Sequence, residues 1–285
     1  MKGKISELLM KVVFFIAACT SVLAVTLICI FLFANGIPAI AKIGLPDFLF
    51  GQKWKPSNNI FGILPFIMGS IYVTAGSIVI GVPLALLLSV FLAFYCPKRL
   101  YPVLKTMVNL MAGVPSVVYG FFGLVMIVPL MRQITGKDGS TMLTASILLG
   151  VMILPTVTGV TESALRSVPV SYYEGALALG ATHERSVFAT VFPAAKSGIM
   201  AGIVLGIGRS IGETMAVIMV AGNQPWMPQG LLKGVRTMTT NIVMEMGYAT
   251  DLHREALIAT GVVLFVFILI INLCVSALKS KAESE

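Results

Sequence analysis

The chain has 285 residues, of which 57% are hydrophobic and only 11% are charged, and its mean hydropathy is +0.96. Soluble domains are about 45–50% apolar and about 25% charged, so this composition excludes an ordinary soluble protein and indicates an integral membrane protein. The net charge of +8 comes mostly from Lys and Arg beside apolar runs, and it gives no reason to expect a nucleic-acid partner.

Six apolar runs are each long enough to cross a hydrocarbon layer roughly 30 Å thick, which takes about 20 helical residues. Backbone polar groups in lipid must pair within their own segment, and the alternating pattern of barrel strands is absent, so these runs are expected to be helices. We therefore predict an all-α polytopic membrane protein with a single transmembrane domain over residues 1–285. Its predicted spans are residues 12–34, 66–95, 106–131, 142–165, 197–222 and 256–278.

The first run follows Lys2, Lys4 and Lys11 and covers residues 12–34. It is longer than the apolar region of a signal peptide, which has about 7–15 residues, so we interpret it as an uncleaved span. Six spans leave both ends of the chain on one side of the membrane. The segments on that side carry more Lys and Arg than the opposite loops, which predicts that both ends are cytoplasmic.

The first outer segment, residues 35–65, contains several prolines that predict either an irregular course or a short helix in the membrane plane. Phe48 and Trp54 are candidate anchors at the membrane surface, where aromatic rings gather.

The third and fourth spans contain residues that bend helices. Gly113 and Pro115 indicate either kinks that line a central path or close helix packing, and the sequence does not separate the two. In the fourth span Pro155 predicts a kink, and Thr156 is a candidate hydrogen-bond donor. Glu162 lies near the cytoplasmic end, where we expect a carboxylate to face an interface or a neighbouring helix rather than a substrate.

The inner loop, residues 166–196, is the longer of the two inner connections. Ser171 followed by Glu174 is a capping-box pattern, which predicts a helix that begins at Tyr172. Gly180 is a natural stop for this helix, because glycine readily adopts the left-handed conformation that ends helices.

A second short helix is predicted to follow in the same loop. Thr182 is its cap and Pro193 ends it. Since only Pro193 and glycine-rich turns separate this helix from the fifth span, we expect the loop and the span to form one nearly continuous element.

The first loop helix is too short to be stable in water and must dock on something. Small residues allow close backbone approach, and larger apolar side chains add contact area. This composition favours a groove on a partner protein, with packing on the chain's own helices as the alternative. The small residues are Ala176, Ala178, Gly180 and Ala181, and the larger ones are Tyr172, Tyr173 and Leu177.

The order and spacing of Glu174, Gly180 and Pro193, with Ala176 near the glutamate, resemble the EAA loop of permease subunits of ATP-binding-cassette importers. In that family the loop is a coupling helix that sits in a cleft of a cytoplasmic ATPase and transmits its closure. The departures from the family pattern are Gly175, Thr190 and Phe192, where Ala, Ile and Leu are usual. The coupling residues that the resemblance implies are Tyr173, Glu174, Ala176, Leu177, Gly180, Ala181 and Pro193.

Further motifs extend the resemblance over nearly the whole chain, from Phe61 to Leu278, and narrow it to the PstC type of phosphate importer permease. They are AGVPSVVYGFFG, ILPTVTGVTESALRSVP, GRSIGETMAV and EMGYATDLHREAL, in that order. The GETMAV segment differs from the sister PstA type, in which it typically reads closer to GETAPL.

The resemblance implies a type I importer fold in a bacterial cytoplasmic membrane, with membrane lipid around the spans. It also implies three kinds of protein partner, namely a sister PstA-type permease subunit, two ATP-binding-cassette ATPase subunits and an external phosphate-binding protein. In such an assembly this chain would translocate inorganic phosphate by alternating access.

Two stripes of small residues follow the fifth span. Small residues at every fourth position let another helix approach closely, so both faces are expected at crowded interfaces. The first stripe is Gly198, Gly202, Gly206 and Ser210, and the second is Gly208, Gly212 and Ala216.

Arg209 and Glu213 lie one turn apart near the middle of the fifth span. Charges at that depth are costly and indicate function. We expect Arg209 to give phosphate a transient bidentate contact, while Glu213 balances the charge or accepts a proton from the anion. A structural ion pair between the two side chains is the alternative interpretation.

No P-loop pattern G-x-x-x-x-G-K-[ST] is present, so the ATPase site is expected on another subunit. His183 and His253 fall on opposite sides of the predicted membrane and are expected at the surface, so we predict neither a metal site nor a cofactor. Competing interpretations are a molybdate or sulfate permease, a secondary transporter or channel that works without ATP, and, more remotely, an intramembrane enzyme.

Overall fold

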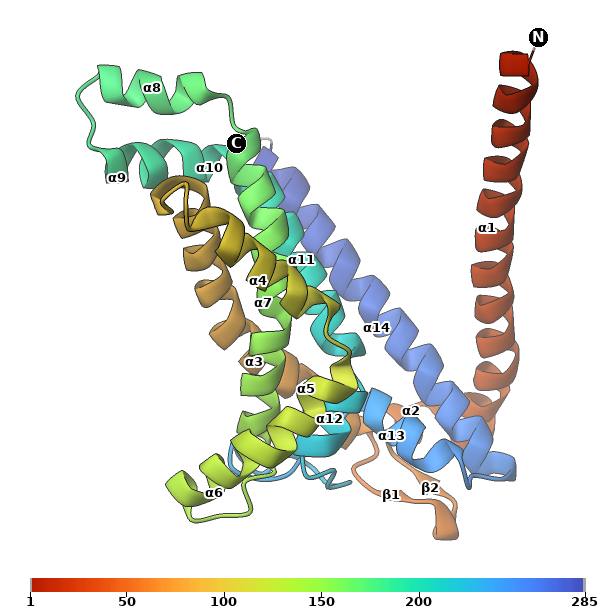
Figure 1. The fold of residues 1–285 in the computed structure, drawn as a ribbon. Coiled ribbons are helices and arrows are strands. Elements are labelled where there is room, and N and C mark those ends of the chain that lie inside the picture. The colour runs from red at the N-terminus through yellow and green to blue at the C-terminus, as the bar shows by residue number, and fades with distance from the viewer. Residues whose placement is uncertain (1, 284–285) are drawn as a thin grey trace.

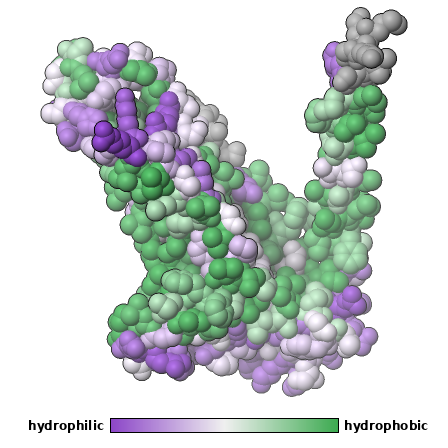
Figure 2. Space-filling model, viewed as in Figure 1, coloured by the Kyte–Doolittle hydropathy of each residue, from purple (hydrophilic) through white to green (hydrophobic). Residues whose placement is uncertain are grey.

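The computed structural model describes the backbone of residues 2–283 and the side chains of residue 7 and residues 9–274. Five of the described helices are long and apolar enough to cross a membrane, and a sixth span results if the bent pair 183–194 and 196–212 is counted as one. Apolar side chains form a belt around the middle of the visible face, and polar side chains gather at both ends (Figure 2). Four of the five spans correspond to the long helices α1 (Lys2–Ile43), α3 (Leu64–Val90), α7 (Met142–Ser167) and α14 (Asp251–Glu283), and α11 (Lys196–Gly212) is the second part of the bent pair.

Helix α1 extends beyond the predicted span 12–34 into the outer segment as far as Ile43. It stands apart from most of the molecule and meets α14 near the lower end of both helices (Figure 1). The segment that follows holds a two-residue antiparallel pairing in which Trp54 lies opposite Phe61. Its elements are α2 (Leu45–Phe50), β1 (Trp54–Lys55), η1 (Pro56–Asn58) and β2 (Ile60–Phe61).

The expectation that Phe48 and Trp54 anchor the chain at the membrane surface is wrong. Phe48 is fully buried and Trp54 is 7% exposed. Both pack in an apolar cluster with Phe66 and with Leu257 of α14. The short pairing of β1 with β2 turns the Trp54 ring inward, where it makes edge contacts with Phe61 and Phe66.

The predicted third span, 106–131, is not one helix. Helix α4 (Tyr101–Gly113) has Val114 as its C-cap. Both Val114 and Pro115 have extended backbone before the next helical segment begins. Proline disfavours helical conformation in the residue before it, which explains the break. The apolar span is instead Ser116–Thr135. It comprises α5 (Ser116–Phe122), the π-helix η3 (Gly123–Ile127) and α6 (Val128–Thr135).

The inner loop and the fifth span do not form one continuous element, because the chain bends by 71° between Ala194 and Lys196. The span is itself divided, since α11 ends at Gly212 and α12 begins at Met215. The remaining helical elements are the π-helix η2 (Phe91–Tyr95), α8 (Val170–Ala178), α9 (His183–Arg185), the π-helix η4 (Ser186–Val191), α10 (Phe192–Ala194), α12 (Met215–Val220) and α13 (Met238–Met246).

The centre of the bundle is formed by α3, α7 and α11. At Gly81 an added Cβ atom would lie 2.6 Å from the Gly150 carbonyl oxygen, so α3 and α7 approach at backbone distance there. In the same bundle the Ser77 and Ser210 hydroxyls form a 2.7 Å hydrogen bond that joins α3 to α11. The two candidate functional regions adjoin this core. The coupling loop connects the end of α7 to the start of α11, and Arg209 lies in the last turn of α11.

Candidate coupling surface and substrate path

Helix α8 of the inner loop begins at Val170, two residues earlier than predicted. Its N-cap is Pro169, which has no side-chain acceptor, so the predicted capping box at Ser171 does not form. The backbone of Pro169 leaves helical conformation at φ −53° and ψ 134°. This fixed turn after α7 therefore sets the start of α8.

Gly180 ends α8 as predicted, with a left-handed φ of +83°. The Gly180 N–H donates to the Leu177 carbonyl at 2.9 Å, and the Ala181 N–H donates to the Ala176 carbonyl at 3.0 Å. These two bonds are those of a Schellman motif, which satisfies the last carbonyls of a helix.

The second loop helix begins at the predicted cap, where the Thr182 hydroxyl accepts a 3.3 Å hydrogen bond from the Arg185 N–H. The helical run that begins there, residues 183–194, comprises α9, η4 and α10 and ends one residue after Pro193, close to the predicted end.

One face of α8 packs on the chain's own helices. The Tyr173 ring stacks with Phe94 at a centroid distance of 6.4 Å, and its hydroxyl forms a 2.7 Å hydrogen bond with His183 Nδ1. His183 also makes an edge contact with Tyr95 at 4.7 Å, so it is half-buried rather than a surface residue as expected. The loop is thereby fixed to the end of the second span.

The other face of α8 is open, and Leu179 at its end is 91% exposed. Between α8 and η4 lies a hollow of about 370 Å³ whose lining includes Ala176, Gly180 and Ala181. These small side chains leave backbone accessible to a partner surface. Of the predicted coupling residues, Tyr173, Ala176 and Ala181 are half-buried, and Glu174, Leu177, Gly180 and Pro193 are exposed.

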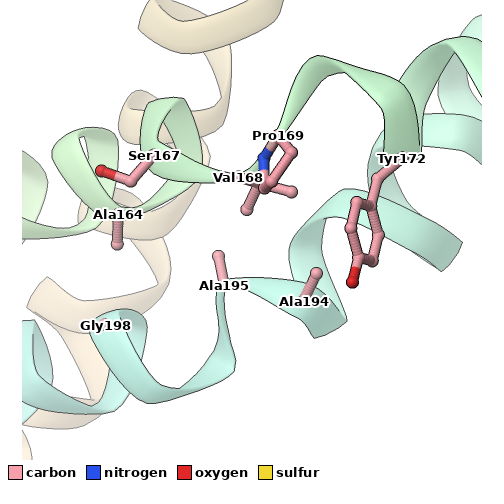
Figure 3. Close-up of a pocket in the computed structure, with 8 residues that line it drawn as sticks. All are labelled: Ala164, Ser167, Val168, Pro169, Tyr172, Ala194, Ala195 and Gly198. Atoms are coloured by element: carbon pink, nitrogen blue, oxygen red, sulfur yellow. The ribbon is translucent and has the colours of Figure 1, made fainter.

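A second hollow, of about 340 Å³, lies where α7, α8 and the α10–α11 corner meet. Figure 3 shows Tyr172 descending from α8 beside Ala194, with Ala164 and Gly198 at the far end of the same hollow. Its lining is mostly small, so the corner between α10 and α11 has open space beside it.

Arg209 lies in the last turn of α11, half-buried, and its Nη1 atom donates a 3.1 Å hydrogen bond to the Thr156 hydroxyl of α7. The sequence predicts Thr156 only as a hydrogen-bond donor within or between helices. Thr156 acts here as an acceptor and fixes one edge of the guanidinium. The position of this partner depends on how α7 packs on α11, which the sequence of either helix does not reveal.

Arg209 and Glu213 do not form an ion pair among the described residues. Helix α11 ends at Gly212, so Glu213 has extended backbone (φ −70°, ψ 127°) and leaves the face on which a one-turn pair would meet. Its Oε1 atom accepts hydrogen bonds from the N–H groups of Thr214 at 3.1 Å and Ala216 at 3.2 Å. The carboxylate therefore satisfies donors at the start of α12.

The first small-residue stripe packs on α7 as predicted. A Cβ atom added at Gly202 would lie 3.0 Å from the Thr161 hydroxyl, and one at Gly198 would overlap the side chain of Ala164. In the second stripe only Ala216 packs closely, since it is fully buried and lies against Gly120 of α5, whereas an added Cβ at Gly208 or Gly212 would meet nothing within 4 Å. Bare backbone thus flanks Arg209 and Glu213 on an open side of the helix.

A polar cluster surrounds Glu245 of α13, and no sequence motif predicts it. Glu245 accepts bonds from Trp54 Nε1 at 2.7 Å and Arg236 Nη1 at 2.6 Å, and His253 Nε2 lies at 2.9 Å. His253 is 13% exposed, so its expected surface position is wrong. No group of three or more His, Cys, Asp or Glu side chains in the described part of the chain could hold a metal ion.

The arrangement of five to six apolar helices within the described residues defines a class, the multi-pass membrane proteins. Residues 81–283 match the family model described as "Binding-protein-dependent transport system inner membrane component". The chain belongs to this family, and its fold is that of the type I importer permeases.

The chain is 36% identical to the "Probable ABC transporter permease protein YqgH" of Bacillus subtilis (strain 168), over 90% of this chain and 87% of that protein. It is 33% identical to the "Phosphate transport system permease protein PstC" of Mesorhizobium japonicum, over 86% of this chain and 81% of that protein.

Several solved structures of ABC transporters share the fold. One inward-facing form of the MetNI methionine ABC transporter has a TM-score of 0.62 at 20% identity and covers 81% of this chain and 99% of that chain. A bacterial ABC transporter for alginate import has a TM-score of 0.64 at 15% identity, with 94% and 96% covered.

Proposed function

We propose that this chain is the membrane subunit of an ATP-driven importer and that it moves inorganic phosphate into the cell by alternating access. The likeness to PstC-named relatives over most of both chains carries the choice of phosphate. The chain has no P-loop, so ATP hydrolysis is assigned to partner subunits.

Arg209 is the proposed cationic contact for the anion in the membrane. Its guanidinium is oriented by Thr156 and is not neutralised by Glu213, so N–H donors remain for a bidentate contact with phosphate oxygens. The open backbone at Gly208 leaves room for an anion to approach. Glu213 forms no ion pair with Arg209, and its proposed part is to offset the positive charge along the path at longer range, so that phosphate is released rather than trapped.

The open face of α8 is the proposed docking surface for an ATPase subunit. The hollow beside Gly180 and the exposed side chains of Glu174 and Leu177 would meet the ATPase cleft, whereas Tyr173 transmits its motion inward through Phe94. A short helix that is already packed on one side loses little conformational freedom on docking, which favours efficient coupling.

The proposed assembly contains a sister PstA-type permease subunit, two ATPase subunits and an external phosphate-binding protein. We place both ends of the chain in the cytoplasm. In support, the start of α1 and the end of α14 lie at the same end of the molecule as α8 (Figure 1). The polar cluster around Glu245 then faces the side on which the binding protein docks.

Charge-neutralising substitutions test the proposed substrate path. Arg209→Gln and Glu213→Gln should each abolish phosphate uptake while the amount of assembled complex stays unchanged, because both side chains are only half-buried and Gln can still form hydrogen bonds at either position. Arg209→Lys keeps the charge without the planar fork and should retain partial uptake. Loss of assembly in the two neutral variants would instead favour a structural role.

Two other functions remain as competitors. A molybdate or sulfate permease would use the same coupling surface and would differ in the external binding protein, so competition by those anions during uptake separates it. A secondary transporter would need no ATPase, and uptake in the absence of ATP would favour it.

A further inference from the structure

Glu162 of α7 is a buried carboxylate held by three donors. Its side chain is 2% exposed. Tyr101 and Lys105, one turn apart on α4, donate at 2.7 Å each, and Arg166 on the next turn of α7 donates at 2.9 Å. Both carboxylate oxygens therefore accept hydrogen bonds. Tyr101 and Lys105, one turn apart on α4, face Glu162 and Arg166, one turn apart on α7. We call these four residues the Glu162 clamp.

The clamp is the principal polar attachment of α4 to the rest of the described chain. Val108 is the only residue of α4 that is buried, and the helix packs mainly on α7. Beyond Gly113 the extended residues Val114 and Pro115 separate α4 from α5. A helix with little buried area and a break at one end depends on such specific contacts for its position.

The other side of the clamp connects to the coupling loop. Arg166 Nη2 donates to the Leu92 carbonyl at 2.7 Å, which ties the end of α7 to η2. The Arg166 guanidinium also lies 4.7 Å from the Tyr101 ring centroid. Only Ser167, Val168 and Pro169 separate Arg166 from α8, so displacement of α8 acts first on the part of α7 that holds Glu162.

We propose that Glu162 is a positioning residue that makes α4 move together with the cytoplasmic end of α7. This inference rests on the proposed role of α8 in receiving motion from an ATPase. Through the clamp, displacement of α8 reaches α4 and then α5, which packs on α12 just beyond Glu213. The clamp thus connects the coupling surface to the substrate path by a route separate from α11.

The double substitution Lys105→Met with Tyr101→Phe tests the clamp without leaving Glu162 as an unpaired buried charge. Glu162 keeps its ion pair with Arg166 on its own helix, so α7 remains stable, whereas α4 loses both donors. Lys98→Met, in the exposed turn before α4, is the matched control. Lys105→Arg, which preserves a charged donor, should retain function.

The measurement uses the complete reconstituted complex with spin labels at Val103 on α4 and Ser163 on α7, both exposed. In the unmodified clamp the distance between the labels should stay narrow with and without ATP. In the double variant the distance should broaden, basal ATP hydrolysis should persist, and phosphate uptake per complex should fall by about tenfold, within the usual range for coupling between sites.

An unchanged label distance together with unchanged uptake in the double variant would overturn the proposal. A fall in the amount of complex with normal uptake per complex would also overturn it, because that result marks a purely structural contact. If the unmodified complex fails to couple ATP to uptake, the proposed function fails. The label distance still reports whether the clamp holds α4.

Discussion

Arg209 and Glu213 are one turn apart in the sequence, yet the structure assigns them to different elements. Arg209 binds Thr156 of α7, whereas Glu213 satisfies N–H groups at the start of α12. The cost of charge in a membrane predicts that both residues matter. Their partners could not be predicted, because they depend on where α11 ends and which face of α7 it meets.

The double neutralisation Arg209→Gln with Glu213→Gln is expected not to restore uptake. In an ion pair, removing both charges relieves the buried charge that either single change strands. Here the two side chains have separate hydrogen-bond partners, so each loss persists. Uptake per assembled complex is the measurement, and recovery in the double variant relative to both single variants would contradict the assignment.

Gly180 and Gly175 form a matched pair within the coupling loop. Neither has an atom within 4 Å of an added Cβ, but only Gly180 has positive φ. Gly180→Ala should therefore cost about 1–2 kcal/mol of local stability and lower phosphate-stimulated ATP hydrolysis.

Gly175→Ala should stabilise helix α8 by roughly 0.5–1 kcal/mol and leave phosphate-stimulated ATP hydrolysis unchanged or higher. Hydrogen exchange of α8 in the assembled complex measures the local stability of both variants. Equal protection in the two would show that the left-handed turn at Gly180 does not determine the end of the helix.

At the scale of elements, apolar runs located most spans but not their interruptions. Pro115 was visible as a potential kink, and the structure makes it a break between α4 and α5. The 71° bend after Ala194 has no proline or glycine at the corner itself. Such a bend depends on the contacts of α8 and η4 with their neighbours, which local sequence does not encode.

The two glycine stripes of α11 predict opposite effects for the same substitution. Gly198→Val would force a side chain into Ala164 and should cost roughly 1–3 kcal/mol, because α7 and α11 would have to shift apart at this contact. At Gly208 an added Cβ meets no atom of the described residues within 4 Å beyond its chain neighbours and its own helix backbone, so Gly208→Val should leave the subunit able to fold.

The amount of folded subunit after detergent extraction, compared by thermal unfolding, distinguishes the two variants. Gly208→Val should nevertheless reduce uptake, because its side chain enters the open space beside Arg209. Equal folding of both variants would contradict the packing of α11 on α7.

At the scale of the whole molecule, the motifs predicted the family and the general fold, which the family match and the fold neighbours confirm. The sequence predicted that Glu162 faces an interface or a neighbouring helix, and its bonds to Tyr101 and Lys105 of α4 confirm this. It predicted neither the set of partners in the Glu162 clamp nor the buried core around Trp54. Both join residues far apart along the chain, and a buried charge is recognisable only when its partners are known.

Cysteine labelling tests the predicted orientation. In a variant in which the native residues Cys19, Cys29, Cys96 and Cys274 are replaced, Leu179→Cys should react only with reagent that enters the cytoplasm. Ser57→Cys, in the exposed turn between β1 and β2, should react from outside. The reverse pattern in intact cells would contradict the placement of α8 in the cytoplasm.

Uptake of radiolabelled phosphate into proteoliposomes is the most direct test of the central claim. The vesicles would contain this chain with the proposed PstA-type and ATPase subunits, with ATP supplied on the α8 side and the phosphate-binding protein on the other. We expect uptake that requires both ATP hydrolysis and the binding protein and that Arg209→Gln abolishes. Uptake driven by an ion gradient without ATP would contradict the account.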